Sequence, residues 1–192
     1  LLVQQVEPKI DNKLSFFLAL YIKEWISPEN KSFRNVTSSE YYQKQSPPYK
    51  ASHHPFISIS ELRLIKDITA KRFLALSPYI TALPETTLIN INTAPQVILR
   101  TLGAGLTKEQ AESLIKLRQQ EPFKKLNDVL NNPRIKKLNI DAKTVTLRSQ
   151  YFLITTTVRL GTESLIYFTK VKRSINKKGV KVEVLMETIN TL

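Results

Sequence analysis

The residues with the clearest chemical potential lie between positions 103 and 110. Gly103-Ala104-Gly105 allow a tight backbone turn, and Thr107-Lys108 follow at the predicted start of a helix. The first backbone N–H groups of a helix have no partner within it, and the helix dipole favours negative charge at that end. These residue types at this spacing could therefore bind a nucleic-acid phosphate.

A structural role for the same residues competes with phosphate binding. The run from Thr107 to Gln110 has the pattern of a capping box, in which each of these two side chains accepts the other's backbone N–H. A capping box uses donors that a phosphate would need, so we favour a scaffold role. DNA binding stays as the alternative. Its site residues are Gly103, Gly105, Thr107 and Lys108.

The preceding residues complete a recognisable supersecondary pattern. Asn92 or Thr93 could cap a first helix, and Pro95 suits its first turn because proline lacks an N–H that would be unpaired there. With the second helix, residues at about 92–130 have the signature of a helix-hairpin-helix unit. The link from Gly105 to the alanine of the second helix is longer than in versions of this unit that bind DNA.

Enzymatic chemistry finds little support in the sequence. His53-His54 are the two histidines; neighbouring residues in a proline-flanked loop face different directions, so we interpret them as surface residues rather than metal ligands. The 16 carboxylates are scattered along the chain, and no phosphate loop, nucleophile elbow or dinucleotide fingerprint is present. We therefore expect neither an enzyme nor a bound cofactor.

Composition narrows the class of protein further. The chain has 192 residues, of which 42% are hydrophobic, so it can bury a core. Its net charge of +13 suits nucleic acid, an anionic membrane surface or an acidic partner. No cysteine is present, and no apolar run is long enough to span a membrane. Leu1-Leu2-Val3 does not resemble a translation start, so we expect a piece of a longer protein.

Helical signals dominate the first three quarters of the chain. Apolar residues recur at three- and four-residue steps over 10–26, where Asp11 or Asn12 could cap a helix. A long loop follows over 27–56, containing tyrosines that could pack it. Shorter helices are predicted from Ser60 and over 70–76, and short helical turns over 124–130 and 141–147.

Strand signals occupy the last quarter. Residues 150–160, 163–173 and 180–189 alternate in polarity and are rich in β-branched and aromatic side chains. Breaks at Gly161-Thr162 and at Asn176–Gly179 predict an antiparallel meander, which needs a helix or a second sheet to cover its apolar face. Helices followed by a sheet predict an α+β fold. The candidate core residues of the sheet are Val158, Ile166, Phe168 and Val184.

Several phrases, taken in order, resemble one family. They are a helix ending in Trp25-Ile26, Tyr41-Tyr42, Pro47-Pro48-Tyr49-Lys50-Ala51, Ile59-Ser60-Glu61-Leu62-Arg63-Leu64-Ile65, Pro78-Tyr79-Ile80-Thr81-Ala82-Leu83-Pro84, Ile89-Asn90-Ile91-Asn92-Thr93-Ala94-Pro95, Gly105-Leu106-Thr107-Lys108-Glu109-Gln110-Ala111 and Pro122-Phe123. Over about residues 10–173 the chain thus resembles the general secretion pathway protein K family, the large minor pseudopilins of type II secretion systems. The longer hairpin is also what this family shows.

The resemblance implies a pilin-like antiparallel sheet with a large inserted α-helical domain that contains the helix-hairpin-helix (SAM-like) unit. We place that domain at 1–147 and the sheet at 148–192. It also implies a subunit at the tip of a periplasmic pseudopilus in a Gram-negative bacterium, where it caps and initiates assembly. Minor pseudopilins I and J are the implied partners, together with secreted substrate proteins. An N-terminal apolar helix, cleaved by a prepilin peptidase, would anchor it in the inner membrane.

Calcium is the one metal that the resemblance brings into question. The family is associated with calcium near an acidic loop after the tryptophan helix. Here Glu29, Asn30 and Glu40 are the only candidate ligands, and Lys31 and Arg34 lie among them. Calcium requires six to eight oxygens, several of them from carboxylates. The sequence therefore favours a solvated loop over a calcium site.

We predict that millimolar calcium raises the melting temperature by no more than about a degree or two, because the loop has too few carboxylates. Binding with calcium at a hundredfold excess over its dissociation constant would add about 2.7 kcal/mol and would be obvious in a thermal melt. A large calcium-dependent shift that Glu29→Ala abolishes would contradict the prediction.

Overall fold

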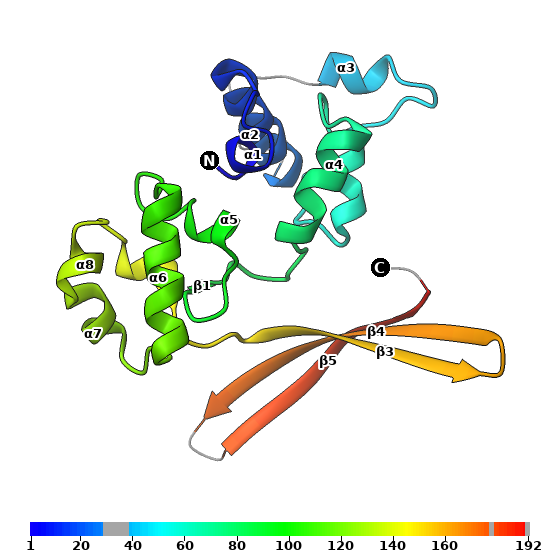
Figure 1. The fold of residues 1–192 in the computed structure, drawn as a ribbon. Helices are drawn as coiled ribbons and strands as arrows, with labels where there is room; N and C mark the ends of the chain where they lie inside the picture. Colours follow the sequence, from blue (N-terminus) through cyan, green and yellow to red (C-terminus); the bar gives the residue numbers. More distant parts are fainter. Residues whose placement is uncertain (29–38, 177–178, 191–192) are drawn as a thin grey trace.

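The chain forms a group of short helices followed by one long antiparallel sheet (Figure 1). The computed structural model describes residues 1–28, 39–176 and 179–190. The helices gather on one side of the sheet, and the three strands extend beyond them as a twisted ribbon. The prediction of a mixed helix and sheet fold with a three-stranded antiparallel sheet is confirmed.

The first helical group precedes residue 80. Its elements are α1 (Leu2–Val6), α2 (Asn12–Ile26), α3 (Ser39–Gln43), the 3-10 helix η1 (Ile59–Leu64), α4 (Ala70–Leu76) and the 3-10 turn η2 (Ser77–Tyr79). Asp11 caps α2, because its side chain accepts the N–H of Lys13 at 2.9 Å. The segment predicted to start a helix at Ser60 is a 3-10 helix that begins one residue earlier, after a capping box formed by Ser58 and Glu61.

Aromatic side chains organise the first core. Leu18, Tyr21 and Trp25 recur on one face of α2 and are buried. Tyr42 is 1% exposed; its ring lies edge-on to Trp25 at 5.5 Å and stacks on Tyr49 at 5.3 Å. Tyrosines within 27–56 thus pack the end of α2, as predicted. The prediction of a loop over this whole stretch is wrong, because Tyr41 and Tyr42 belong to the short helix α3.

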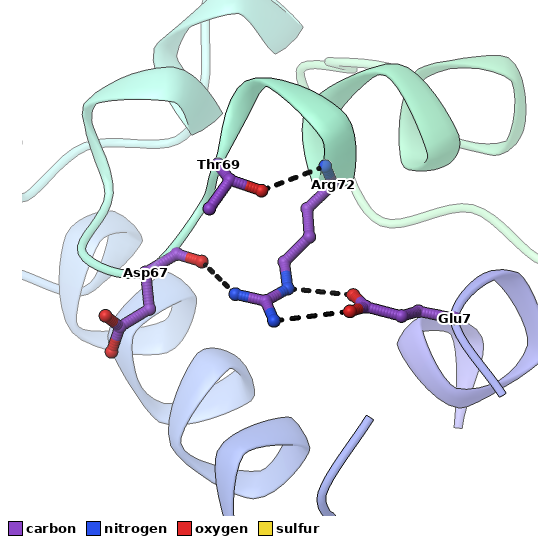
Figure 2. A network of polar contacts seen from close by, with 4 residues as sticks. All are labelled: Glu7, Asp67, Thr69 and Arg72. Atoms are coloured by element: carbon purple, nitrogen blue, oxygen red, sulfur yellow. Dashed lines mark hydrogen bonds and ion pairs between the residues drawn. The ribbon is translucent and has the colours of Figure 1, made fainter. Parts of the chain in front are cut away.

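An arginine ties the two ends of this group together (Figure 2). Arg72 of α4 donates from Nε and Nη2 to the Glu7 carboxylate at 2.8 and 3.3 Å, and from Nη1 to the Asp67 carbonyl at 2.8 Å. The backbone N–H of Arg72 is capped by the Thr69 hydroxyl. Because the Arg72 and Glu7 side chains are only 18 and 31% exposed, this two-pronged contact fixes the segment after α1 against α4.

The second helical group has a separate core. Its elements are β1 (Ile89–Asn90), α5 (Gln96–Leu99), α6 (Lys108–Gln120), α7 (Leu126–Asn131), α8 (Pro133–Lys136), the 3-10 turn η3 (Ala142–Thr144) and β2 (Val145–Thr146). Leu99, Ala111 and Leu114 are buried at its centre. The two-residue strands β1 and β2 pair in parallel, so the start and the end of this group meet.

The predicted cap at Asn92 or Thr93 is wrong. The first helix begins at Gln96, with Pro95 as its N-cap residue and no side-chain cap. Asn92 instead spans two other segments: its Nδ2 donates to the carbonyls of Phe123 and Leu147 at 2.9 and 3.2 Å, and its Oδ1 accepts the N–H of Phe123 at 2.9 Å. The side chain satisfies backbone groups far away in sequence rather than those of its own helix.

The sheet follows the predicted meander. It consists of β3 (Tyr151–Leu160), β4 (Glu163–Asn176) and β5 (Gly179–Ile189), paired in sequence order. The first turn contains Gly161, as predicted, and part of the second lies outside the described residues. Two of the four predicted core residues are wrong: Val158 and Val184 are 47 and 56% exposed.

Two hydrophobic clusters therefore lie within the predicted helical domain. One joins residues between Leu18 and Leu76, and the other joins residues between Ile91 and Val145. The proposed boundary between a helical domain at 1–147 and a sheet at 148–192 stays a prediction.

We predict that Gly103→Ala destabilises the fold more than Gly161→Ala. Both glycines have a left-handed backbone, with φ of +58° and +62°, so alanine bears a conformational cost of roughly 1–2 kcal/mol at either position. Only at Gly103 would the new Cβ also lie 2.9 Å from the Leu138 carbonyl oxygen, whereas nothing lies within 4 Å at Gly161. The extra loss should be about 1 kcal/mol or more in urea unfolding. Equal losses would contradict this close approach.

Candidate interaction surface

One face of the sheet is apolar and largely exposed, although Val171 near its centre is buried. Side chains alternate between the two faces along each strand, and the register joins Phe152, Val171 and Val184 in one row. We call the face that carries this row the open face. Its exposed large apolar residues are Phe152, Ile154, Val158, Leu160, Leu165, Tyr167, Ile175, Val180, Val182, Val184 and Ile189.

Exposed large apolar side chains are concentrated on the open face rather than on the opposite face of the sheet. The eleven residues are 38 to 83% exposed, and among the exposed large apolar residues of β3–β5 only Leu153 belongs to the opposite face. Leu185 is the extra residue of a bulge between the pairs Val171–Val184 and Lys170–Met186. A contiguous apolar surface of this kind typically marks a site for another polypeptide.

The opposite face contacts the helical part through polar side chains. The Glu85 Oε1 atom accepts hydrogen bonds from the Tyr151 hydroxyl at 2.6 Å and from Lys172 Nζ at 2.7 Å. Lys170 Nζ donates to the Ala82 carbonyl at 3.0 Å. The segment around 82–85 is thus fixed to β3 and β4, and this contact positions the sheet relative to the helices.

These contacts change the pKa values of Glu85, Lys172 and Tyr151. The hydrogen bond from Lys172 is the main cause that lowers the pKa of Glu85, and the Tyr151 hydroxyl adds to it. The same bond to Glu85 raises the pKa of Lys172. Burial and then the bond to Glu85 raise the pKa of Tyr151. The ionised carboxylate is therefore favoured by the folded state.

A pocket of about 440 Å³ lies where the sheet meets the second helical group. We call it the junction pocket. It is lined by the apolar side chains Leu83 and Leu88 and by threonine and serine residues, and Arg148 and Arg173 contribute positive charge. Asn90 of β1 holds this region together by donating to the Ser149 hydroxyl at 2.9 Å.

The predicted phosphate-binding residues do lie together at the start of α6. The capping box is present: Gln110 N–H donates to the Thr107 hydroxyl at 3.2 Å, and Thr107 N–H donates to Gln110 Oε1 at 2.8 Å. Glu109 lies in the same first turn, where hydrogen bonds from its own backbone N–H and from Thr107 lower its pKa. A carboxylate of the chain therefore already occupies the surroundings that a phosphate would need. The scaffold role stays a prediction, and DNA binding through Gly103, Gly105, Thr107 and Lys108 stays its alternative.

The predicted metal ligands are only partly described by the structure. Glu29 and Asn30 lie outside the described residues. Glu40 forms an ion pair with Lys44, whose hydrogen bond lowers the pKa of this carboxylate. Over residues 1–28, 39–176 and 179–190, no group of three or more potential metal-ligating side chains occurs. The solvated loop without bound calcium stays a prediction.

Of the two histidines, His54 is exposed, as expected for a surface loop. His53 is half-buried instead, and its Nδ1 lies 2.9 Å from the Ser27 carbonyl oxygen. It holds its loop against the end of α2.

The sequence analysis did not predict the residues that join the helical part to the sheet. Glu85, Tyr151 and Lys172 come from three separate segments, and none of them belongs to a motif. The alternation of polarity along the strands predicted that the sheet has an apolar face. It did not predict which residues of the sheet are exposed.

Two family models described as "Type II secretion system (T2SS), protein K" match the chain, at residues 3–85 and 89–148. They coincide with the two helical groups. Two curated relatives carry the name "Type II secretion system protein K". The relative from Klebsiella pneumoniae is 27% identical over 151 residues, covering 75% of this chain and 46% of the relative. The relative from Pseudomonas aeruginosa is 24% identical over 158 residues, covering 82% and 47%.

A solved structure has a similar fold. It is the crystal structure of the GspK-GspI-GspJ complex from the enterotoxigenic Escherichia coli type 2 secretion system, matched with a TM-score of 0.78 at 20% identity over 100% of this chain and 69% of that chain. This chain spans less than half the length of the curated relatives described above. In the part of the chain that the structure describes, none of the helices is long and apolar enough to cross a membrane.

We predict that Glu85→Gln makes the stability of the protein less sensitive to acid. The pKa of Glu85 is lowered in the folded state, so its ionisation stabilises the fold above the usual value of 4.5 and this contribution is lost as the pH falls through the folded pKa. The melting temperature of the variant should therefore fall less between pH 7 and about pH 3 than that of the wild type.

The matched control is Glu163→Gln, which removes a carboxylate from the exposed start of β4 without touching the junction. It should keep the acid sensitivity of the wild type. If both variants respond alike, Glu85 does not hold the junction.

Proposed function

Because this chain belongs to the family of type II secretion system protein K, we propose that it is part of a minor pseudopilin at the tip of a type II secretion pseudopilus. In this role it caps the pseudopilus and initiates its assembly for protein export across the outer membrane. It works in the periplasm as a structural subunit without catalytic activity. Minor pseudopilins I and J are its partners, a proposal that the GspK-GspI-GspJ complex supports by similarity of fold.

The observation that carries this proposal is the open face of the sheet. Eleven large apolar side chains lie exposed on one side of three strands, and a sheet of this size needs a helix or another sheet to cover it. In a pilin-like fold an apolar helix has this role. We therefore propose that the open face is buried against an apolar helix in the assembled pseudopilus.

The helical part suits a subunit that ends a filament. It lies on the other side of the sheet from the open face, joined to it through Glu85. A bulky group of helices in that place leaves no equivalent surface for a further subunit. The two helices α5 and α6, with their glycine loop, form the proposed helix-hairpin-helix unit. It acts as scaffold, since its glycine loop packs closely on the Leu138 carbonyl.

We predict that the chain forms a stoichiometric complex with the soluble domains of pseudopilins I and J from the same system, eluting as one species in size exclusion. Val158→Glu should weaken the complex about tenfold or more, because an unpaired carboxylate would be buried on the open face. The neighbouring Thr157→Glu places the same charge on the opposite face and should change affinity by about twofold or less. Both positions are exposed, so neither variant should lower the melting temperature of the free chain appreciably.

DNA binding is the alternative function, and the same protein tests it. A clamp at the start of α6 would bind duplex DNA with a steep salt dependence, and Lys108→Glu would abolish that binding. We test the hairpin by substituting Lys108 rather than Gly105, because Gly105 has a φ of +98°, where any side chain is strained. We expect weak binding that Lys108→Glu and the distant Lys71→Glu reduce equally. Loss specific to Lys108→Glu, without a complex with pseudopilins I and J, would overturn the proposed function.

A further inference from the structure

The junction pocket is positively charged and lacks a counterion. Arg148 and Arg173 both line it, and among the described residues that line it there is no aspartate or glutamate. Neither guanidinium forms an ion pair within residues 1–28, 39–176 and 179–190, although nearby Lys172 does so with Glu85. The chain as a whole carries a net charge of +13, so an anion is attracted to this region.

Arg173 is held in place before any ligand arrives. Its Nη2 atom donates to the Ser149 carbonyl at 2.8 Å, and its guanidinium lies over the Phe152 ring, 5.0 Å from the centroid. The side chain is half-buried, so its position costs little further entropy on binding. Its other N–H groups have no hydrogen-bond partner among the described residues. A planar arginine with free donors suits the two oxygens of a carboxylate.

The edge of a strand is also open beside this pocket. The Arg173 N–H donates to the Gln150 carbonyl at 2.6 Å, which shows that it points towards the β3 side of β4. Backbone groups of residues two apart point the same way, so the N–H and C=O of Ile175 also point to that side. The pairing of β3 with β4 begins at Tyr151 and Lys172, so within the described part of the chain no strand lies there beside Ile175.

The junction pocket thus combines three features: the open strand edge at Ile175, the free N–H groups of Arg173, and apolar side chains. Ile175 lines the junction pocket together with both arginines, and Leu83 and Leu88 supply apolar surface. An extended segment could pair with the open edge at Ile175 while its side chains enter the pocket. Main-chain hydrogen bonds then provide affinity, and the pocket selects the side chains.

We propose that the junction pocket binds an extended segment of a partner polypeptide in which an aspartate or glutamate is flanked by apolar residues. The backbone of the segment pairs with Ile175, and its carboxylate lies between Arg148 and Arg173. The apolar neighbours of the acidic residue contact Leu83 and Leu88. This site goes beyond the proposed function and does not depend on it: Ile175 lies at the end of the open face, but Val158, which the complex experiment changes, does not line the pocket.

The experiment uses a fluorescent synthetic peptide, Val-Thr-Leu-Glu-Leu-Thr-Val, acetylated and amidated so that the glutamate is its only charge. Anisotropy should show saturable binding to this chain at low salt. The same peptide with glutamine in place of glutamate should bind about fivefold more weakly or worse, because it loses the charged hydrogen bonds. A third peptide with N-methylated backbone amides keeps the charge but cannot pair with a strand edge, and should also lose binding.

The matched protein variants are Arg148→Gln and Arg159→Gln. Both arginines are exposed and each change removes one charge, but only Arg148 lines the pocket. Arg148→Gln should lower the affinity for the glutamate peptide about fivefold or more and leave the affinity for the glutamine peptide unchanged. Arg159→Gln should change neither affinity by more than about twofold. Equal binding of the glutamate and glutamine peptides, equal loss in the two variants, unchanged binding of the N-methylated peptide or absence of binding would each overturn the proposal.

Discussion

The Glu85 carboxylate is the contact on which the arrangement of the molecule depends. A single oxygen accepts hydrogen bonds from Tyr151 on β3 and Lys172 on β4, and Lys170 reinforces the same contact through the Ala82 carbonyl. These directional polar contacts fix the segment at 82–85 against the sheet. The junction pocket lies next to these contacts, since Tyr151 and Leu83 both line it.

The two helical groups reach order by different means. The first buries large aromatic rings around Trp25 and uses Arg72 to join its ends. The second has smaller buried side chains and relies on backbone contacts, among them the parallel pairing of β1 with β2 and the three hydrogen bonds of the Asn92 side chain. Asn92 joins three segments, so its loss would release both the hairpin and the chain entering the sheet.

Local signals in the sequence were sufficient wherever the cause was itself local. The capping box at Thr107, the cap at Asp11 and the helix over 70–76 depend on residues within one turn of each other, and all were predicted. The meander was predicted because alternation and glycine turns are also local. The short elements β1, β2 and α8 were not predicted, since two to four residues carry no periodicity.

The sequence alone did not predict which side of each helix or strand contacts another part of the chain. Asn92 resembles a helix cap in sequence but bonds to Phe123 and Leu147, which only the fold brings near. Val158 and Val184 have the composition of core residues and are exposed, because alternation identifies an apolar face without indicating what covers it. The residues of the junction pocket come from four segments and share no pattern.

The bulge at Leu185 has a consequence for how the free chain behaves in solution. In the described part of the chain β5 is the outermost strand of the sheet and lies next to an apolar face, a combination that invites copies of one chain to add to each other as a continuous sheet. An extra residue in that strand breaks the regular spacing of its hydrogen-bonding groups and increases the local twist. Stacking of strands into a fibre requires a straight and regular edge. The irregular strand thus lets an apolar surface stay available for its proper partner while it hinders polymerisation of the chain with itself.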